Sequence, residues 1–493
     1  MDKEGHSLPS ASCADGRKRR VCYYYDPGIA NVDYGADHHM VPRRVAMAHA
    51  LVEKYGLLAD MERLRVRPAT KAELRAFHDD AYVRLLHDIT QDADHRQGDA
   101  EILETARACG IGVPDPGETA AYDNPVIDGL WDYCVRYAGG SLAAARALAS
   151  GTSDIAINWS GGMHHACQGR ASGFCYVNDI VLAIQELLKH FERVLYVDID
   201  VHHGDGVEEH FKRDSRVMTV SFHRYGEDRP GGEKFFPGTG TAEDVGEGDG
   251  KYYTLNVPMD AHMDDESYQH LFRPIMHKVM EKFSPDAVVL QCGADSLYGD
   301  RLGNFTLSVK GHAGCVSYLR SFNVPLLLLG GGGYTINHVA SCWCYETAVA
   351  VGKEEGISDE IPFHGYEHYY RDQGYKLHFT VPKTNGNKID VAAMEKIKQD
   401  ALMNLAMLKP PPTTQRHRRP SKRHGIDVNA LFDHHSKNSK EKDKKSKKYR
   451  REEDDPMERL HRLCCEADRY SFFTELGKRK ACEVANTTFS NPK

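Results

Sequence analysis

Several features that would place a protein in a membrane or outside the cell are missing from this 493-residue sequence. It has no run of about 18 consecutive apolar residues, so we expect no membrane-spanning helix. The N-terminal segment 1–20 is polar and lacks the apolar stretch of a secretory signal. The 13 cysteines are odd in number and include no Cys-x-x-Cys pair. We therefore expect an intracellular protein with reduced thiols and no disulfide framework.

Charge is unevenly distributed along the chain. The sequence contains 63 Lys and Arg against 71 Asp and Glu, a net charge of −8. Segment 416–451 alone holds 14 basic and 4 acidic side chains, which leaves a net charge of −18 on the remainder. An acidic body favours cationic partners. Clustered Lys and Arg are typical of import signals, so we predict a nuclear protein, with GRKRR (16–20) as a weaker second signal. The alternatives for segment 416–451 are a solvated linker and nonspecific contact with nucleic acid.

Composition divides the chain into three parts. We predict a disordered N-terminal segment over 1–20, a folded body over 21–407, and a basic, mostly disordered tail over 408–493. The tail contains long stretches almost free of apolar residues, which cannot bury a core. Hydrophobic residues make up 41% of the whole chain, enough for a large core in the body.

Short apolar runs in the body predict buried β-strands, at 154–159, 193–200, 217–222, 286–291 and 324–330. Helical patterns lie between them. In segment 178–191, for example, apolar residues recur on one helical face behind Asn178 or Asp179 as the N-cap. Continuous apolar strands that alternate with helices predict an α/β protein with one parallel sheet covered on both faces.

Polar side chains follow four of these predicted strands. They comprise two adjacent histidines, a cluster of carboxylates and imidazoles, a lone aspartate, and a tyrosine behind four glycines: His164 and His165, segment 198–205, Asp295, and Tyr334. Sites in open parallel sheets lie beyond the carboxyl ends of the strands. We therefore expect these side chains to meet at one edge of the sheet.

Asp200, His202 and Asp295 are the predicted metal ligands. Asp200 and His202 are two residues apart, so their side chains point to the same side of an extended segment. Asp295 completes a set of two oxygens and one nitrogen from the neighbouring strand. Three protein ligands with one open position are typical of a catalytic zinc site. The plain alternative, for any one of these residues alone, is a polar surface loop.

The remaining residues of the four segments suit hydrolysis at such a metal. Asp198 and Asp205 are not needed as ligands and can accept hydrogen bonds from the two histidines. A carboxylate behind a histidine fixes the tautomer of the ring and supports its protonated form. Tyr334 offers a neutral hydroxyl to a developing oxyanion. The glycines before it let the backbone approach a reactive centre, or form a simple tight turn.

Five blocks of sequence carry a resemblance to a known family: HHACQGRASGFCYVND (164–179), DIDVHHGDGVEE (198–209), FFPGTG (235–240), QCGADSL with GDRLG (291–303), and LGGGGYT (329–335). They resemble the signature motifs of the class I zinc-dependent histone deacetylases, of the plant type, over residues 21–400. The resemblance implies the arginase–deacetylase fold, an α/β architecture with a single open parallel eight-stranded sheet and helices on both faces.

The resemblance also implies an activity and a catalytic set. The activity is zinc-dependent hydrolysis of N6-acetyl-lysine on histone tails to lysine and acetate, which represses transcription within a corepressor complex. One zinc ion would bind the three predicted metal ligands. His165, paired with Asp205, resembles the general base and acid of the family. His164, paired with Asp198, resembles an electrostatic aid. Tyr334 matches the residue that polarises the substrate carbonyl.

Substrate and potassium positions carry over in the same way. Gly173, Phe174 and Phe236 resemble the walls of a narrow channel for acetyl-lysine, with Leu302 near the rim. Asp123 matches a rim carboxylate that holds substrate backbone amides. One implied structural potassium ion would use Asp198, Asp200, His202, Ser221 and Phe222. A second would use Phe211, Asp214, Val217 and Tyr253.

Three departures from the family pattern lie outside the catalytic set. Segment 227–235 (EDRPGGEKF) adds about seven residues at 228–234, where a neutral loop insertion is the plain interpretation and altered substrate preference or occlusion of the channel the alternative. Val41 and Asn337 replace basic residues that help relatives bind inositol phosphate, although Arg301 is kept. We therefore expect little dependence on inositol phosphate.

Two other functions compete with the deacetylase. One is a catalytically weak paralogue that serves as a scaffold subunit, which the intact set of metal-ligand and acid–base residues disfavours. The other is an arginase-like two-metal ureohydrolase. A second metal would need an Asp two residues after the ligating histidine, where this chain has Gly204.

Overall fold

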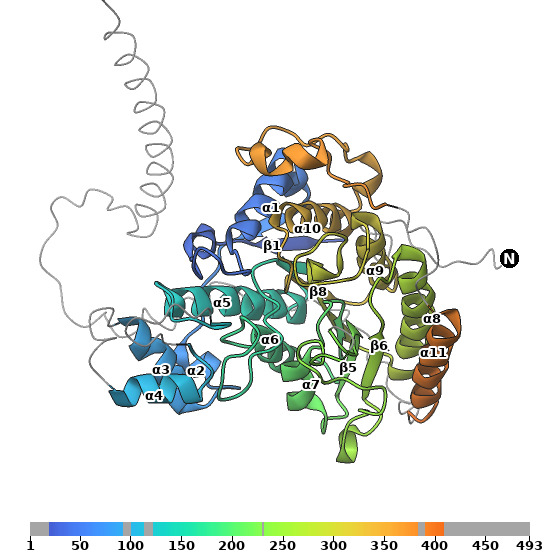
Figure 1. Cartoon of the computed structure of the whole chain (residues 1–493), viewed down its shortest axis with the longest axis horizontal. Helices are drawn as coiled ribbons and strands as arrows, with labels where there is room; N and C mark the ends of the chain where they lie inside the picture. The colour runs from blue at the N-terminus through green and yellow to red at the C-terminus, as the bar shows by residue number, and fades with distance from the viewer. Residues whose placement is uncertain (1–18, 92–99, 113–121, 229–230, 383–389, 409–493) are drawn as a thin grey trace, which may run out of the picture. The chain divides into compact units, whose positions relative to one another are not determined.

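The structure is a computed structural model that describes residues 19–91, 100–112, 122–228, 231–382 and 390–408 (Figure 1). The predicted N-terminal segment and the basic tail with its import signal lie almost wholly outside these residues, so what we expect of them stays a prediction. Within the described residues, Arg20 already belongs to the folded body, because its guanidinium pairs with Asp154 at 3.0 Å just before the first strand.

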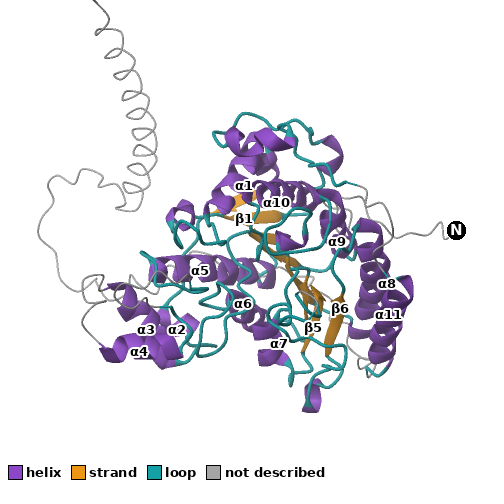
Figure 2. Cartoon of the chain, viewed as in Figure 1, coloured by secondary structure: helices purple, strands orange, loops and turns teal. Residues whose placement is uncertain are grey.

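A single open sheet of parallel strands organises the described chain (Figure 2). The strands are β1 (Val21–Tyr24), β2 (Glu62–Leu64), β3 (Ile155–Asn158), β4 (Val194–Asp198), β5 (Val217–Arg224), β6 (Thr254–Met259), β7 (Ala287–Gln291) and β8 (Leu326–Leu329). Their order across the sheet is β2-β1-β3-β8-β7-β4-β5-β6, and every neighbouring pair is parallel. The predicted eight-stranded parallel sheet is confirmed.

Helices cover both faces of the sheet. The α-helices are α1 (Arg43–Lys54), α2 (Lys71–Leu74), α3 (Asp80–Gln91), α4 (Ala100–Ala108), α5 (Leu130–Ala149), α6 (Asp179–Leu187), α7 (Asp205–Phe211), α8 (Asp265–Phe283), α9 (Val309–Ser321), α10 (Ile336–Val351) and α11 (Val391–Ala406). Short 3-10 helices are η1 (Pro27–Asn31), η2 (Leu57–Asp60), η4 (Gly248–Gly250), η5 (Ala294–Ser296), η6 (Glu354–Gly356) and η7 (Glu367–Gln373).

Two hydrophobic cores result, one on each face. In β4, Leu195 and Val197 pack into the core that α1, α8, α9, α10 and α11 share. The alternate residues Val194 and Tyr196 pack into the core that includes α3, α5 and α6. This alternation follows from the period of two along a strand. Because both faces are buried, the strand is apolar throughout, which is why the sequence shows a continuous apolar run.

Three strands were not among the apolar runs. β2 is three residues long and mostly exposed, and β6 contains Pro258, which lacks the backbone donor that an inner strand needs. Both lie at the edges of the sheet, where polar residues and proline are tolerated. The buried β1 is as long as β3 and β8, which were predicted, but its apolar residues directly follow the basic segment 16–20.

Candidate active site

One cavity lies where the sequence predicted the site. The strands β3, β8, β7 and β4 are neighbours, so the segments that follow them emerge at the same edge of the sheet. A cavity of about 800 Å³ opens there, and His165, His202 and Tyr334 line it. The side chains of the four predicted segments therefore meet at this edge of the sheet, where some line the cavity and the others are buried.

The three predicted metal ligands come together at the floor of this cavity. Asp200 and Asp295 are fully buried, and His202 is 6% exposed. His202 Nδ1 lies 3.1 Å from Asp200 Oδ1 and 3.1 Å from Asp295 Oδ2. One ligand atom from each of the three residues lies within 4.8 Å of the others.

The reason for this convergence differs from the one predicted. β4 ends at Asp198, so Asp200 and His202 lie in the turn after the strand and not in an extended segment. Side-chain to backbone hydrogen bonds shape the turn. Asp198 Oδ1 accepts from the backbone of Asp200 at 3.1 Å, and Asp200 Oδ1 accepts from the backbone of His202 at 3.0 Å. The interpretation of alternating side chains was therefore wrong, although the same residues meet.

The second oxygen of each metal-site carboxylate is held by the protein. Asp200 Oδ2 accepts from Gln291 Nε2 and from the backbone of Gly332, each at 2.8 Å. Asp295 Oδ1 accepts from the backbone of Val201 at 2.9 Å. These bonds leave one oxygen of each carboxylate aimed at His202 Nδ1.

The donor set suits a divalent metal ion. No Lys or Arg of the described residues pairs with the two buried carboxylates that face His202 Nδ1. Burial and the neighbouring Asp200 raise the pKa of Asp295 to about 7, and a divalent cation at this place would favour the deprotonated form of both carboxylates. Two oxygens and one nitrogen are ligand types that zinc accepts. The cavity in front of His202 leaves room for a further ligand.

Each predicted catalytic histidine has its carboxylate. His164 Nδ1 lies 2.7 Å from Asp198 Oδ2, and His165 Nδ1 lies 2.7 Å from Asp205 Oδ1. These contacts use Nδ1 of both rings. The rings lie 3.9 Å apart, and only His165 lines the cavity. A carboxylate on Nδ1 orients the ring, so His165 is placed to exchange protons in the cavity through Nε2.

The surroundings give the two histidines opposite charge preferences. Burial lowers the pKa of His165 to about 4, and the neighbouring ring of His164 adds to this effect. Burial also disfavours the charged form of His164, but Asp198 and Asp200 outweigh it and raise its pKa to about 9. Near neutral pH, His165 is therefore free to accept a proton, while His164 carries one.

Tyr334 follows β8 and lies at the same edge of the sheet as the metal site. Its ring lies 6.5 Å from that of His202 and 5.6 Å from that of Phe174, both edge to face. Burial raises the pKa of the Tyr334 hydroxyl well above its usual range, so the group stays a neutral donor. Asp300 anchors this position, because its Oδ2 accepts from the backbone of Tyr334 at 2.7 Å.

The implied substrate residues all line the same cavity: Asp123, Gly173, Phe174, Phe236 and Leu302. Phe236 lies 5.0 Å from the ring of His165 and 6.0 Å from the ring of His202. Gly173 has a φ of 51°, and a Cβ there would lie 2.5 Å from the His165 ring, so a side chain at Gly173 would displace the base. Two aromatic walls thus lead to the two histidines.

The described residues of the 227–235 insertion form part of the mouth. Glu227 and Lys234 pair as an antiparallel bridge, and Asp228 and Glu233 line the cavity beside Lys234. Arg224, at the end of β5, holds this hairpin: its guanidinium lies 3.1 Å from the Asp228 carboxylate. The insertion is therefore a fixed wall of the cavity in the residues that the structure describes.

The same arginine links the insertion to the metal site. The Arg224 guanidinium lies 4.1 Å above the centre of the Phe235 ring. The Phe235 ring in turn stacks on His202, with centroids 5.0 Å apart and planes at 6°. Cation–π and stacking contacts thus run without a break from the hairpin to a predicted metal ligand.

Each of the two implied potassium sets includes residues of β5, the first Ser221 and Phe222 and the second Val217. Asp198 and Ser221 are paired across β4 and β5, and Ser221 Oγ lies 2.9 Å from His223 Nδ1. The second set surrounds the turn between α7 and β5, where the backbone of Asp214 donates to the Phe211 carbonyl at 2.8 Å. Val217, the first residue of β5, and Tyr253, in the loop before β6, complete that set.

The positions that differ from the family pattern are accounted for locally. Asn337 donates through Nδ2 to Gln373 Oε1 at 2.7 Å. Arg301 lines the cavity mouth, and Val41 is half-buried before α1. A Cβ at Gly204 would lie 2.3 Å from the Asp198 carboxylate, so no side chain fits where a two-metal ureohydrolase needs an Asp.

Some residues that shape the site were missed by the sequence reasoning. Gln291 supports both Asp200 and the backbone of Gly293, and Asp300 binds the loops that precede Gly303 and Tyr334. A signal existed for Gln291, which is the polar end of an otherwise apolar strand. Asp300 carries no such signal, because its role depends on two loops that meet only in the folded protein.

Comparisons with known proteins agree with this geometry. A family model for the histone deacetylase domain matches residues 38–350. Histone deacetylase 19 of Arabidopsis thaliana is 54% identical over 420 residues, which are 85% of this chain and 78% of that protein. Histone deacetylase 2 of Oryza sativa subsp. japonica is 51% identical over 448 residues, 87% and 83% of the two chains. Histone deacetylase 1 of Bos taurus is 50% identical over 400 residues, 81% and 78%. The predicted resemblance and the arginase–deacetylase fold are confirmed.

Proposed function

Because the chain belongs to the histone deacetylase family, we propose that it hydrolyses the amide of N6-acetyl-lysine on histone tails with one bound zinc ion. The observation that carries this proposal is the convergence of two His–Asp pairs, a buried set of two carboxylates and one imidazole, and a tyrosine on one narrow cavity. Within the described residues, no helix has the length and apolar character for crossing a membrane.

Asp200, His202 and Asp295 hold the zinc ion in this proposal. A bound zinc ion supplies Lewis acidity at the acetyl carbonyl and lowers the pKa of an attacking water. The walls formed by Phe174 and Phe236 hold the apolar side chain of acetyl-lysine and exclude bulk water from it.

Side chains of the protein carry out the proton transfers. His165, neutral near pH 7, takes the proton of the attacking water on Nε2, while Asp205 stabilises the resulting imidazolium at Nδ1. His165 then returns a proton to the leaving lysine amine. His164, kept protonated by Asp198, places positive charge beside the reacting atoms. The Tyr334 hydroxyl donates to the oxyanion as it forms.

Two potassium ions complete the proposed metal content. One would be held by the set around Asp198 and Ser221, and one by the set around Asp214. Both sites rest on the family resemblance. The alkali ions would act as structural ions, because no residue of either set lines the cavity except His202, which is also a proposed zinc ligand.

Metal analysis of the purified chain, together with an assay on acetyl-lysine peptides, tests the proposal. One zinc per chain and deacetylation that a chelator abolishes are the expected results. A chain that binds zinc but does not deacetylate peptides, alone or with partners, would instead support the scaffold function. A chain without zinc that still deacetylates would contradict the proposed metal site.

We also infer that the protein acts in the nucleus, within a corepressor complex that represses transcription. A fluorescent fusion that ends at Thr414 lacks the basic segment 416–451 and should spread into the cytoplasm, whereas the full chain should accumulate in the nucleus. Replacing Arg17 and Lys18 in the full chain is the matched control and should have the smaller effect, and it spares Arg19 and Arg20, which belong to the folded body. A truncated fusion that stays nuclear would place the signal elsewhere.

Inositol phosphate should have little effect on this chain. Val41 and Asn337 remove two charge-assisted contacts relative to the family pattern, each worth roughly 1.5–3 kcal/mol. Such a loss weakens binding by about a hundredfold or more. Titration of inositol hexakisphosphate into the enzyme with its corepressor domain should give no saturable activation. The double variant Val41→Lys, Asn337→Arg should gain that response, and strong activation of the unchanged chain would contradict the prediction.

A further inference from the structure

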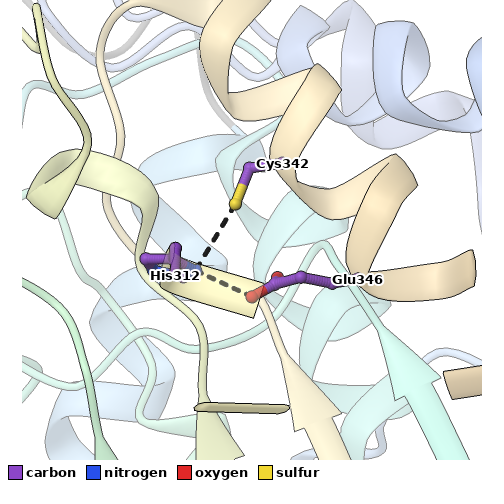
Figure 3. A group of neighbouring side chains, drawn as sticks. All are labelled: His312, Cys342 and Glu346. Atoms are coloured by element: carbon purple, nitrogen blue, oxygen red, sulfur yellow. Dashed lines mark hydrogen bonds and ion pairs between the residues drawn. The ribbon is translucent and has the colours of Figure 1, made fainter. Parts of the chain in front are cut away.

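A second group of ionisable side chains lies behind the metal site, on the far side of the loop that carries Asp295. His312 comes from α9, and Cys342 and Glu346 come from α10 (Figure 3). All three are fully buried. His312 Nδ1 lies 2.7 Å from Glu346 Oε1 and 3.4 Å from Cys342 Sγ. The proposed mechanism gives these residues no part.

Hydrogen-bond chemistry determines the state of the histidine. His312 Nε2 lies 2.8 Å from the carbonyl oxygen of Gly293, which can only accept, so Nε2 carries a proton. The short contact between Nδ1 and Glu346 then needs one further proton, on the ring or on the carboxyl group. Despite the penalty of burial on a charged ring, the pKa of His312 is raised well above its usual range, and burial raises the pKa of Glu346 as well. The pair therefore keeps its shared proton.

A hydrogen-bonded pair fits these distances better than a metal ion. Two ligands of one tetrahedral zinc ion lie roughly 3.3 Å apart, because each is about 2.0 Å from the metal. The 2.7 Å between His312 Nδ1 and Glu346 Oε1 is the length of a charge-assisted hydrogen bond. Burial raises the pKa of Cys342 to about 11, so its thiol stays protonated and is a poor ligand.

The target of this pair, Gly293, is in contact with the metal site. A Cβ on Gly293 would lie 2.0 Å from Asp200 Oδ2, which shows how closely its backbone approaches that ligand. The Gly293 amide donates to Gln291 Oε1 at 2.7 Å, and the next amide, of Ala294, donates to the Gly332 carbonyl at 3.0 Å. Asp295 follows directly. A small shift of the Gly293 peptide would therefore move two metal ligands.

We propose that Glu346 and His312 are positioning residues for the metal site: Glu346 orients the His312 ring through Nδ1 so that its Nε2–H fixes the Gly293 carbonyl, and the fixed peptide sets the positions of Asp200 and Asp295. The only other side chain of the described residues that donates to this carbonyl is Ser296, through a longer contact of 3.4 Å. Outer partners of metal ligands typically change metal affinity by about 10–100-fold. The inference rests on the proposed zinc site.

Zinc retention against a competing chelator is the test, because it does not depend on catalysis. His312→Leu removes the donor to Gly293 and should weaken zinc binding by about 10–100-fold. Glu346→Leu should do the same, since it leaves the His312 ring without its partner at Nδ1. Glu346→Gln is the conservative variant: its amide can donate to His312 Nδ1 and keep the proton on Nε2. It should restore zinc binding to within a few-fold of the unchanged chain.

Cys342→Ala is the matched control. It opens space in the same pocket but leaves the bonds from Glu346 through His312 to Gly293 intact, so it should lower thermal stability and leave zinc affinity unchanged. Equal zinc loss in Cys342→Ala and His312→Leu would overturn the proposal. Unchanged zinc affinity in Glu346→Leu would also overturn it, and this second measurement still applies if the His312→Leu chain does not fold. Failure of the zinc site itself is distinguishable, because the unchanged chain would then hold no zinc.

Discussion

Asp295→Asn should lose the metal ion and the deacetylase activity together while the fold survives. The two oxygens of Asp295 have separate tasks: Oδ1 accepts from the backbone of Val201 at 2.9 Å, and Oδ2 faces His202 Nδ1 at 3.1 Å. Asparagine keeps an oxygen for the backbone bond and places an amide N–H₂ group toward the metal. An amide nitrogen bears no lone pair that can serve as a ligand at neutral pH, so one of the three protein ligands disappears.

Metal content and activity of the variant should be measured on the same preparation, with thermal unfolding as the check on the fold. Asp228→Asn is the matched control, because Asp228 lies in the same cavity but pairs with Arg224. The control should keep its zinc and most of its activity. Full zinc occupancy in Asp295→Asn would remove Asp295 from the ligand set.

Tyr334→Phe should bind substrate almost normally and turn it over about 10²–10³ times more slowly, the usual cost of losing one oxyanion donor. The ring itself packs edge to face with Phe174 at 5.6 Å, and the phenylalanine ring can keep this contact. The hydroxyl matters most once the carbonyl oxygen gains charge, so the effect should fall on kcat and little on KM.

Tyr225→Phe provides the comparison for Tyr334→Phe. Tyr225 lies beside the mouth, where its hydroxyl accepts from Lys234 at 3.1 Å, and its ring does not line the cavity. Loss of this hydroxyl should leave kcat within a few-fold of normal. Unchanged turnover in Tyr334→Phe would show that the tyrosine is no oxyanion donor, and a large rise in KM would indicate a role in substrate binding.

The apolar inner strands could be predicted from the sequence because both faces of the sheet are buried. The run 193–200 predicted β4, whose observed bounds are Val194–Asp198, and 286–291 predicted β7, observed at Ala287–Gln291. The N-cap of α6 was also predictable: Asn178 accepts from the backbone of Val181 at 3.0 Å. The edge strands β2 and β6 were not: β2 is mostly exposed and needs no apolar pattern, and the buried β6 is interrupted by Asn256 and Pro258.

The meeting of the site residues was predictable from chain topology alone, since strand ends of a parallel sheet share an edge. The local geometry was not. Asp200 and His202 are brought together by a turn that side-chain oxygens stabilise, and such a turn leaves no periodic signal in the sequence. The contacts of Arg224 with Phe235 and Asp228 depend on how an insertion folds back, which the resemblance does not cover.

The order of the strands has a consequence for how the chain reaches this structure during synthesis. β3 pairs on one side with β1 and on the other with β8, which aligns Ile155 with Leu326. Until the ribosome has released β8, the segment β2-β1-β3 and the segment β7-β4-β5-β6 have no strand between them. Each presents an open, apolar edge, and such edges invite pairing with other chains.

The sheet can be completed only when β8 pairs with β3, and these strands are far apart in the sequence. Contacts between residues so far apart in the sequence form slowly, so we expect slow folding. A nascent or truncated chain that stops before Leu326 holds the residues of both His–Asp pairs and all three proposed zinc ligands, yet lacks the strand that joins its two halves. Such a chain should depend on chaperones and aggregate when they are scarce. The chain can complete the sheet that carries the active site only after β8 has been synthesised.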